Sequence, residues 1–582
     1  MSTRIVVGQG SCGLAAGAGA VYTALEEKVT SASLSITGCI GICYLEPIVD
    51  VYAEDGKLYR CVQVKPEHAE TIVSAAETGN FELLKDLVIK EDDAQFLSKQ
   101  TRIALRHCGI INPDEIDAYM ADDGYQALEK VLKTMTPEQV IEEIKISGLG
   151  GRGGAGFPTW FKWNAARQSK GEEKYLICNA DEGDPGAFMD RAVIESDPHN
   201  LIEGMLIGAY AIGAKEAIVY VRAEYPLAIV RLTNAIKQAE AKGILGENIM
   251  GTGFSCKMRI KAGAGAFVCG EETALIESLE GSRGMPRLKP PFPAQAGYWL
   301  KPSNITNVET FANIAWIINN GGAAFSAMGT ENSKGTKVFA VTGKVNRSGL
   351  VEIPMGKTLR DVIFDIAGGI RGGHEFKAVQ LGGPSGGCIP AHLLDTVIDY
   401  RALGATGAIM GSGGMVVMDE TTCMVGIAKF FLEFTTRESC GKCVHCRIGT
   451  KRLSEILERI VKGEGKEGDI ELLEELCVSI KDGALCGLGQ TAPNPVLTTI
   501  RYFRNEYEAH IRDKKCPAKE CPALLTYSID PAKCIGCSLC AKKCPVGAIS
   551  GELKKTYAID PNVCIRCGQC IHSCRKGAVV VE

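Results

Sequence analysis

Hydrophobic and polar positions follow two periods along this chain, and each period predicts one type of element. Residues 136–147, TPEQVIEEIKIS, open with a Thr-Pro start and then carry apolar residues at helical spacing, which predicts a helix. Residues 175–178 form a short apolar run, which predicts a strand that delivers the polar residues from Asn179 onward to a loop. Strands and helices that follow each other in this way are typical of a multidomain α/β protein.

Other segments differ in pattern, and we place domain boundaries where the pattern changes. Residues 4–7 predict a strand followed by a turn at Cys12, and residues 336–410 alternate apolar and turn residues, as in a small mixed β domain. Helical spacing in LLEELCVSI predicts that Cys477 lies in a core. The resulting division is 1–85, 86–130 as a helical connector, 131–335, 336–420, 421–510 as a helical domain, 511–526 as a linker, and 527–582.

Composition narrows the class of protein. The chain has 582 residues, of which 46% are hydrophobic and 23% charged, which is typical of a globular protein with several domains. A formal net charge of -5 gives no electrostatic reason to expect nucleic acid or an acidic membrane as a partner. The sequence has no apolar run of the roughly 18 residues that span a bilayer, and its start lacks the zones of a secretory signal. We therefore expect no membrane partner and a cytoplasmic location.

Cysteine is the most informative residue type, because 15 of the 25 cysteines lie between Cys440 and the C-terminal residue. Their close spacing in a large chain favours thiolate ligands for metal over disulfides. One group of four cysteines recurs with the same spacing 30 residues later. Three thiolates of a [4Fe-4S] cluster come from a tight loop and the fourth from the opposite repeat. We therefore predict one cluster on Cys534, Cys537, Cys540 and Cys574, and another on Cys564, Cys567, Cys570 and Cys544.

This repeat resembles the bacterial ferredoxins that carry two [4Fe-4S] clusters. Arg575 stands where the second motif usually has proline, and we expect this change to affect loop stiffness or potential more than ligation. Zinc is the weaker alternative, because paired Cys-x-x-Cys hooks would lack the third cysteine and the trailing one. The tail therefore predicts one-electron transfer between a partner protein and a site upstream in the chain.

A glycine-rich segment, GLGGRGGAGFPTWFKW, follows the first predicted helix. Gly151, Gly153 and Gly156 match the pattern G-x-G-x-x-G, but a dinucleotide fingerprint follows a strand, so a flexible surface loop is the alternative. Arg152 and Lys162 add cations to the backbone amides of this loop, and that combination can hold a phosphate.

Acidic residues lie beside glycine in two further segments. Asp181 and Glu182 follow the predicted strand, and Glu271 and Glu272 follow a glycine turn and a predicted short apolar strand around Phe267. Carboxylates do not hold phosphate, but they accept hydrogen bonds from ribose hydroxyls, ribityl hydroxyls or a carboxamide. Helix capping and solvated loop charge are the alternatives for any one of these residues. Together they favour a binding site.

These segments, with residues 287–293 and 305–310, closely resemble the NADH-oxidising FMN subunit of respiratory complex I over about residues 136–500. The resemblance implies a Rossmann-like core and a β-grasp insert. It implies an FMN site formed by Gly151, Arg152, Gly153, Lys162, Asn179, Asp181, Gly270, Glu271, Glu272 and Asn307. It further implies that NAD(H) stacks above the flavin, held by Phe157, Glu182, Asp184, Lys289 and Phe292, with Glu182 and Asp184 as the catalytic acids.

Three positions depart from the pattern of that family. Asp184 replaces the usual glutamate, Phe267 replaces a tyrosine, and Thr306 replaces the common asparagine. We expect the first change to alter nicotinamide affinity or the choice between NAD and NADP. We expect the other two to shift the flavin potential.

A third cysteine group lies between the flavin region and the tail. Cys440, Cys443 and Cys446 have the loop spacing of a [4Fe-4S] site, and the fourth ligand must come from elsewhere in the chain. Cys477 and Cys486 are the candidates, and resemblance to the complex I family favours Cys486.

His510, Cys516 and Cys521 lie at the joint between the helical domain and the tail. Their spacing permits a structural zinc hook, although only three ligands are evident. The alternative is a linker with two free thiols.

The N-terminal segment resembles a thioredoxin-like [2Fe-2S] domain over about residues 1–85. Cys12, Cys39 and Cys43 match its ligands, but Gly17 stands near the place of the expected partner of Cys12, and Cys61 is a poor substitute. Two interpretations stay open: a docking domain without a cluster, or a [2Fe-2S] site with an unusual fourth ligand.

Hydride chemistry moves two electrons and each cluster moves one, so a flavin is needed between NAD(H) and iron-sulfur clusters. The order of domains resembles the flavin subunit of NAD(P)-linked, often electron-bifurcating [FeFe] hydrogenases, and of related formate dehydrogenases and ferredoxin:NAD oxidoreductases. We expect FMN, NAD(H) and three [4Fe-4S] clusters, with a [2Fe-2S] cluster and zinc as open alternatives.

The partners expected from this resemblance are a catalytic large subunit, a small [2Fe-2S] subunit and ferredoxin. Two rival functions remain. One is a non-enzymatic scaffold with a degenerate flavin pocket. The other is an NADH dehydrogenase that feeds a quinone-linked complex.

Overall fold

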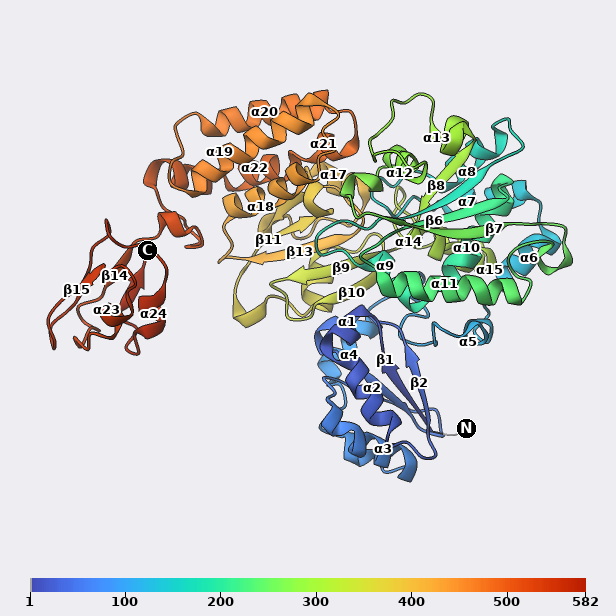
Figure 1. Cartoon of the computed structure of the whole chain (residues 1–582), viewed down its shortest axis with the longest axis horizontal. Coiled ribbons are helices and arrows are strands. Elements are labelled where there is room, and N and C mark those ends of the chain that lie inside the picture. Colours follow the sequence, from blue (N-terminus) through green and yellow to red (C-terminus); the bar gives the residue numbers. More distant parts are fainter. Residues whose placement is uncertain (1–2) are drawn as a thin grey trace. The chain divides into compact units, whose positions relative to one another are not determined.

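The computed structural model describes residues 3–582, which divide into two compact units (Figure 1). Of the described residues, the first unit comprises 3–417 and 485–488, and the second comprises 418–484 and 489–582. The boundary at residue 418 lies close to the predicted start of the helical domain at residue 421. The finer division into seven domains stays a prediction.

The N-terminal part of the first unit is a four-stranded sheet of order β2-β1-β3-β4 (Figure 1). β1 pairs in parallel with β2 and antiparallel with β3, which pairs antiparallel with β4. The strand predicted at 4–7 is confirmed. The turn predicted at Cys12 is wrong, because its alanines favour a helix, which ends at Gly17 with a φ of 106°. The elements are β1 (Arg4–Gly8), α1 (Ser11–Ala16), α2 (Ala18–Glu26), β2 (Ser33–Thr37), β3 (Val49–Tyr52), β4 (Leu58–Cys61) and α3 (Ala69–Thr78).

The centre of the first unit is a parallel sheet of order β7-β6-β5-β8. Its middle strands are apolar and buried, because helices such as α10 pack against them. The chain runs outward from β5 through β6 to β7 and then returns to the other side of β5 as β8, so the strand order reverses between β5 and β8. The elements are β5 (Tyr175–Ala180), α9 (Met189–Ser196), α10 (Pro198–Ile212), β6 (Glu216–Arg222), α11 (Pro226–Ala241), β7 (Lys257–Gly263), α12 (Glu272–Leu279) and β8 (Ser303–Asn307).

Three local predictions concern segments of this region. The strand predicted at 175–178 is confirmed as β5. The helix predicted at 136–147 is confirmed as α7 (Pro137–Ser147), with Thr136 as its N-cap. The short strand predicted around Phe267 is wrong, because the sheet strand is the preceding segment, β7, and residues Phe267–Gly270 form a 3-10 turn that leads into α12.

The insert after this sheet is a five-stranded sheet of order β10-β9-β13-β11-β12. β9 pairs antiparallel with β10 and in parallel with β13, so the sheet is mixed, as predicted for residues 336–410. Its strands bury an apolar core that also includes Ile40, Ile42 and Phe96 from the N-terminal part of the chain. The elements are β9 (Thr336–Gly343), β10 (Gly349–Pro354), β11 (Phe376–Leu381), β12 (Gly387–Pro390), α17 (Tyr400–Ala405) and β13 (Gly414–Asp419).

The second unit combines a group of packed helices with a small β tail (Figure 1). Cys477 is fully buried in the helical core, as predicted. The long helices are α18 (Met424–Arg437), α19 (Thr450–Val461), α20 (Asp469–Gly483) and α22 (Asn494–Glu508). The tail contains β14 (Tyr527–Ile529), α23 (Leu539–Lys543), β15 (Ile549–Ser550), β16 (Ala558–Ile559), α24 (Gln569–Ser573) and β17 (Val579–Val581).

Shorter helices connect these elements along the chain. They are α4 (Glu91–Ser98), α5 (Ile116–Met120), α6 (Gln126–Thr134), α8 (Thr159–Gln168), α13 (Pro293–Ala296), α14 (Val308–Ala312), α15 (Ile314–Asn320), α16 (Gly322–Ser326) and α21 (Gly487–Thr491). Within residues 3–582, none of the helices combines the length and the apolarity needed to cross a bilayer.

Candidate functional site

Polar side chains meet at the carboxyl edge of the parallel sheet, where the strand order reverses. Asn179 near the end of β5 is paired in register with Asn307 at the end of β8. Asn179 Nδ2 donates to the carbonyl of Gly270 over 2.8 Å, and Asn307 Nδ2 donates to Asp190 over 2.6 Å. Ligands of open α/β sheets bind at this kind of switch point. The sheet therefore brings together residues that the sequence separates by more than a hundred positions.

Two lysines and two glutamates form a charged cluster at the same edge. Lys162 Nζ donates to Glu272 over 3.1 Å and to the carbonyl of Ile305 over 2.7 Å. Lys289 Nζ donates to Glu272 over 2.7 Å and to Glu271 over 2.9 Å. Burial acts to raise the pKa of Glu272, but the two ammonium groups hold that pKa below its ordinary value. The cluster offers both ammonium donors and carboxylate acceptors to a ligand.

Helix capping, which the sequence left open for the acidic residues, applies to two of them. Glu271 is the N-cap of α12 and accepts from the backbone N–H groups of residues 273 and 274, each over 2.9 Å. Glu182 accepts from Asp190 N and Arg191 N over 3.0 and 3.1 Å, at the first turn of α9. Burial raises the pKa of Glu182. Capping and ligand binding are compatible, since each carboxylate has several lone pairs.

Asp184 occupies the loop after β5 and is half-buried. Its carboxylate accepts from Ser412 Oγ over 2.5 Å, and burial raises its pKa to about 6. A carboxylate kept in a desolvated loop at a cost in stability is typical of functional sites. Asp184 therefore remains a candidate for contact with a ligand.

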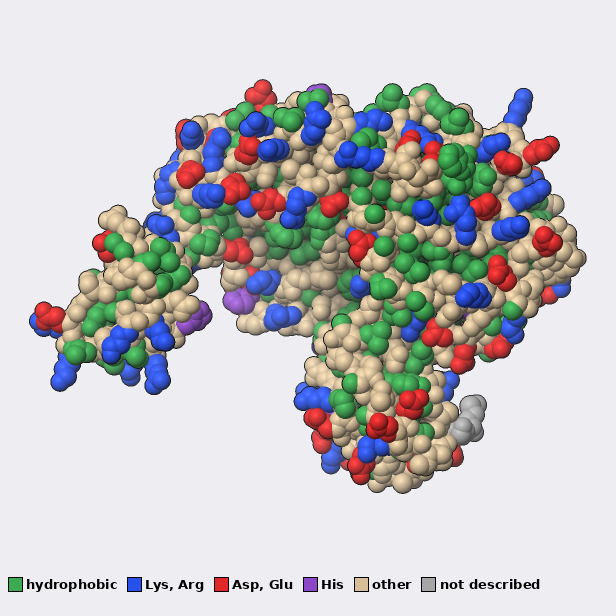
Figure 2. All heavy atoms as spheres, viewed as in Figure 1, with side chains coloured by type: hydrophobic (Ala, Val, Ile, Leu, Met, Phe, Trp, Pro, Cys, Tyr) green, Lys and Arg blue, Asp and Glu red, His purple; other side chains and the backbone are tan. Residues whose placement is uncertain are grey.

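Phe157 and Phe292, both predicted to contact a nucleotide, are about half exposed. The ring of Phe157 packs edge-on against Phe161, with 5.7 Å between the ring centroids. Hydrophobic side chains gather over α8 and α13, the helices next to these residues, among charged ones (Figure 2). Exposed aromatic faces beside polar groups are common where a planar ligand binds.

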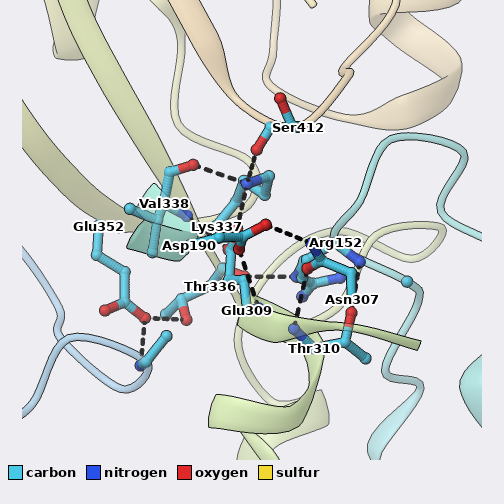
Figure 3. A network of polar contacts seen from close by, with 12 residues as sticks. Arg152, Asp190, Asn307, Glu309, Thr310, Thr336, Lys337, Val338, Glu352 and Ser412 are labelled. Carbon is cyan, nitrogen blue, oxygen red and sulfur yellow. Dashed lines mark hydrogen bonds and ion pairs between the residues drawn. The ribbon is translucent and has the colours of Figure 1, made fainter. Parts of the chain in front are cut away.

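The glycine-rich loop lies against the same edge. Arg152 of this loop is predicted from the sequence to bind a phosphate, but its side chain binds backbone carbonyls. Arg152 is 1% exposed, and its guanidinium donates to the carbonyls of Gly150, Lys334 and Thr336 over 2.9, 2.6 and 2.9 Å. Arg152 and Thr336 are drawn in Figure 3. The expectation that its side chain supplies a phosphate-binding cation is therefore corrected. Because this charge is used to hold backbone, only the backbone of the loop is available to a phosphate.

Glycine permits a close approach at Gly153 of this loop. A Cβ atom at Gly153 would lie 3.1 Å from the Cβ of Asn307, so the loop passes directly over the end of β8. Gly151 N donates to the carbonyl of Phe157 over 2.8 Å, which closes the loop. The structure thus places the predicted loop residues next to the predicted strand-end residues.

A buried polar network lies beneath this edge (Figure 3). Lys337 is fully buried, pairs with Glu309, and donates to the carbonyls of Val338 and Ser412 over 2.7 and 2.5 Å. Glu309 also accepts from Val338 N over 2.9 Å, and its own N–H donates to Asp190 over 3.2 Å. Asp190 also accepts from Asn307, so the network connects this candidate binding residue to Lys337 on β9 of the insert.

Replacing Glu309 by glutamine is expected to lower the free energy of unfolding by about 3–5 kcal/mol, because it leaves the Lys337 ammonium buried without its counter-charge. Chemical denaturation of the full chain measures the effect. The double variant Glu309→Gln/Lys337→Met should regain part of the loss. Asp395→Asn, which breaks an exposed pair with Arg360, should change stability by no more than about 0.5 kcal/mol. Equal effects of the buried and exposed variants would contradict the expectation.

The tail contains two cavities that match the predicted cluster ligands. One is lined by Cys534, Cys537, Cys540 and Cys574, and the other by Cys544, Cys564, Cys567 and Cys570. Ligands of a single zinc ion would lie about 3.8 Å apart in tetrahedral geometry. Within residues 3–582, some groups of three or more His, Cys, Asp or Glu residues have ligand atoms that all lie within 4.8 Å of one another, as a single ion would require. None of these eight cysteines belongs to such a group. The wider spacing around each cavity suits an iron-sulfur cluster better than one ion.

The third cysteine group lies between α18 and α19. Cys446 is buried, while Cys440 and Cys443 are partly exposed, and Ser439 Oγ lies 3.2 Å from the sulfur of Cys446. Cys486 lies in the segment 485–488 of the first unit and stays a predicted fourth ligand.

The predicted zinc hook gains a fourth residue, Cys423, which the sequence did not indicate. Cys423, His510, Cys516 and Cys521 are all buried, and their ligand atoms lie within 4.8 Å of one another. Cys423 Sγ lies 3.4 Å from His510 Nε2 and 3.6 Å from Cys521 Sγ. His510 Nδ1 bonds the carbonyl of Glu506 over 2.7 Å, which turns Nε2 toward the sulfurs. Three thiolates and an imidazole in this geometry fit tetrahedral zinc.

The N-terminal domain also gathers thiols. Cys12, Cys39 and Cys43 have sulfur atoms within 4.8 Å of one another. Glu46 lies beside them, with Cys12 Sγ donating to its Oε1 over 3.5 Å, and burial raises the pKa of Glu46 to about 7. Cys61, which the sequence marks as a poor substitute for the fourth ligand, is fully buried in the core of the domain and is not part of this group.

Comparisons with known proteins identify the family of three segments of the chain. Three family models match: the Nuo51 FMN-binding domain over residues 144–316, the NADH-ubiquinone oxidoreductase-F iron-sulfur binding region over 426–510, and a 4Fe-4S dicluster domain over 526–578.

Two curated proteins illustrate the similarity. The chain is 62% identical over 457 residues to NADP-reducing hydrogenase subunit HndC of Solidesulfovibrio fructosivorans, which covers 78% of this chain and 93% of that protein. It is 46% identical to the F 2 subunit of NADH-quinone oxidoreductase from Rhizobium meliloti (strain 1021), with 71% of this chain and 99% of that protein covered.

Among solved structures, NAD+-reducing [NiFe]-hydrogenase in the air-oxidized state matches with a TM-score of 0.63 and 30% identity, over 88% of this chain and 85% of that one. The same enzyme in the H2-reduced state matches with the same TM-score and 31% identity.

Proposed function

Because this chain belongs to the family of FMN and iron-sulfur oxidoreductases that includes the F subunits of NADH-quinone oxidoreductase and the hydrogenase subunit HndC, we propose that it carries electrons between NAD(H) and its ferredoxin-like tail. The assembly that we propose for it is a multisubunit hydrogenase. Electron bifurcation by the whole complex is part of the proposal. The observation that carries the proposal is the pairing of Asn179 with Asn307 at the switch point of the parallel sheet.

The residues at this edge fit a flavin mononucleotide. The backbone of the glycine loop and the ammonium of Lys162 suit the phosphate, and the carboxylates of Glu271 and Glu272 suit ribityl hydroxyls. The amides of Asn179 and Asn307 can bond the polar edge of the ring system. Bound flavin would accept two electrons as hydride from NADH and release them one at a time.

The nucleotide fits above this edge. The half-exposed rings of Phe157 and Phe292 offer faces for stacking. Lys289 can bond a phosphate, and Asp184, whose pKa of about 6 leaves it mostly ionised at neutral pH, can accept from a ribose hydroxyl. Glu182 positions the first turn of α9 beneath them.

The cluster and domain assignments complete the proposal. We assign three [4Fe-4S] clusters to the ligand sets predicted from sequence, zinc to the four-residue group around Cys423, and a [2Fe-2S] cluster to the N-terminal thiols. The strand orders support a thioredoxin-like N-terminal domain, a Rossmann-like core, a β-grasp-like insert and a ferredoxin-like tail. Chains that carry this many thiolate ligands work in reducing compartments, which supports a cytoplasmic location.

The proposed partners are a hydrogen-activating large subunit, a small [2Fe-2S] subunit and soluble ferredoxin. The name of the similar protein HndC, a subunit of an NADP-reducing hydrogenase, favours hydrogen over formate as the terminal substrate. The quinone-linked alternative rests on the similarity to the F 2 subunit of NADH-quinone oxidoreductase.

Anaerobic titration of the FMN-loaded full chain with NADH tests the proposal, and NADH is expected to bleach the flavin absorbance. Lys289→Met should weaken the apparent NADH affinity by about tenfold to a hundredfold, because a charged hydrogen bond contributes about 1.5–3 kcal/mol. Lys261→Met, at an exposed site on β7, is the matched control and should change nothing. A chain that binds FMN but does not bleach would instead indicate the scaffold function.

A further inference from the structure

The spacing of the N-terminal thiols defines one half of a two-iron site. Cys39 Sγ and Cys43 Sγ lie 3.7 Å apart. Two thiolates bound to one tetrahedral metal at about 2.3 Å are separated by about 3.8 Å. The backbone N–H of Gly41 also donates to Cys39 Sγ over 3.3 Å, a contact that stabilises cluster-bound sulfur. Cys39 and Cys43 are therefore spaced as the two ligands of one iron.

The other half needs a partner for Cys12, and the structure places Glu46 there. Glu46 Oε1 lies 3.5 Å from Cys12 Sγ. A thiolate at about 2.3 Å and a carboxylate oxygen at about 2.0 Å on one tetrahedral metal are separated by about 3.5 Å. Glu46 is not a member of the group formed by the three sulfurs, and its contact with Cys12 places it on the Cys12 side of the site. The three sulfurs lie within 4.8 Å of one another, and thiolates on different irons are farther apart than thiolates on one iron, so Cys12 Sγ moves away from Cys39 and Cys43, toward Glu46, when the second iron binds.

We propose that Glu46 is the fourth protein ligand of a [2Fe-2S] cluster, with Cys39 and Cys43 on one iron and Cys12 and Glu46 on the other. The inference rests on the proposed assignment of a [2Fe-2S] cluster to this domain and goes beyond it by naming the missing ligand. Iron displaces the proton that Cys12 now donates to the carboxylate. Iron with a non-thiolate ligand pair is known chemistry, since histidines replace two cysteines in Rieske centres.

The surroundings hold the Glu46 carboxylate in a ligating orientation. Glu46 is 9% exposed, and its Oε2 accepts from Ile48 N over 3.0 Å, which leaves Oε1 directed at Cys12. Gly13 gives the carboxylate room, because a Cβ atom there would lie 3.1 Å from Oε2. A buried carboxylate positioned by one backbone bond and one thiol is pre-organised for a metal.

The other candidates for a fourth ligand fit less well. Cys61 is fully buried, packs in the apolar core between β4 and α3, and lies outside the group of three sulfurs. Gly17 ends α1, and a Cβ atom there would meet no atom within 4 Å. Asp50 is a buried carboxylate of the same domain, but Arg60 engages both of its oxygens over 2.8 and 2.7 Å.

The test uses the full chain, purified anaerobically and reduced with dithionite. Electron paramagnetic resonance is recorded at a temperature at which [4Fe-4S] signals are broadened beyond detection, and iron is counted in the same samples. Glu46→Ala should reduce the [2Fe-2S] signal at least about fivefold and remove about two iron atoms per chain. Glu46→Cys should keep both irons and shift the g values, because the second iron then has two thiolates.

The controls separate ligation from folding. Cys61→Ala and Asp50→Asn should keep the wild-type g values and iron content. The proposal is overturned if Glu46→Ala and Glu46→Cys both retain the wild-type g values, or if Cys61→Ala removes the cluster. A wild-type chain without any [2Fe-2S] signal would overturn the cluster assignment itself. A folding defect in Glu46→Ala leaves the Glu46→Cys comparison decisive, because that variant restores a ligand.

Discussion

Replacing Cys537 and Cys574 together by alanine is expected to remove one [4Fe-4S] cluster from the tail, whereas replacing Cys537 and Cys544 together is expected to remove both. The reason is that the first cavity is completed by Cys574 from the other repeat, and the second by Cys544. Of about eight tail irons, about four should therefore remain in the first double variant and about none in the second. Iron analysis of the two proteins measures the difference.

The same variants separate the flavin from the tail. Both should lose NADH-driven reduction of ferredoxin by more than about a hundredfold, since a one-electron relay with a missing cluster is interrupted. Dye reduction by NADH should persist, because the residues proposed to hold the flavin belong to the first unit. Ser573→Ala, next to Cys574, is the matched control. The reverse iron pattern, with both clusters lost in Cys537→Ala/Cys574→Ala, would show that each repeat binds its own cluster.

Replacing Cys423 by alanine is expected to lower the bound zinc from about one ion per chain to about none, and to destabilise the second unit. Its sulfur lies 3.4 Å from His510 Nε2 and 3.6 Å from Cys521 Sγ, so it completes a tetrahedral set. The loss of affinity should exceed the roughly tenfold to hundredfold cost of changing an outer contact of a metal site. Metal analysis and thermal unfolding give the two readouts.

Cys477→Ala is the control for this variant, because Cys477 is an equally buried cysteine of the same helical core but lies outside the zinc group. It should keep its zinc and lose only the stability expected from a small cavity. Retention of zinc by Cys423→Ala would leave His510, Cys516 and Cys521 as a three-ligand site and would contradict the role of Cys423.

Short-range patterns predicted the local elements well. α7 follows from helical spacing and β5 from a short apolar run, and both patterns depend on neighbours in sequence. The strand predicted around Phe267 is wrong because the apolar content of a segment does not determine which of two adjacent segments enters a sheet. Arg152 failed because a cation in a glycine loop can bind a ligand or hold backbone, and only the fold decides between them.

Long-range partners could not be predicted from spacing. Cys423 lies 87 positions before His510, so the short spacing of His510, Cys516 and Cys521 does not include it. Glu46 is not a cysteine, so the cysteine spacing of the N-terminal domain does not include it. The pairing of Asn179 with Asn307 depends on the return of the chain to the far side of β5. The repeat in the tail is the exception, because its two halves with equal cysteine spacing predict that each cluster takes its fourth cysteine from the opposite half.

The distance along the chain between Cys423 and Cys521 affects the timing of biosynthesis. The two cysteines are 98 positions apart, and the ribosome adds about 5–20 residues per second, so Cys521 is made about 5–20 seconds after Cys423. During that interval the proposed zinc site lacks Cys521, so the thiol of Cys423 depends on the reducing state of its surroundings. A shortage of zinc would therefore act on newly made chains before it acted on finished ones.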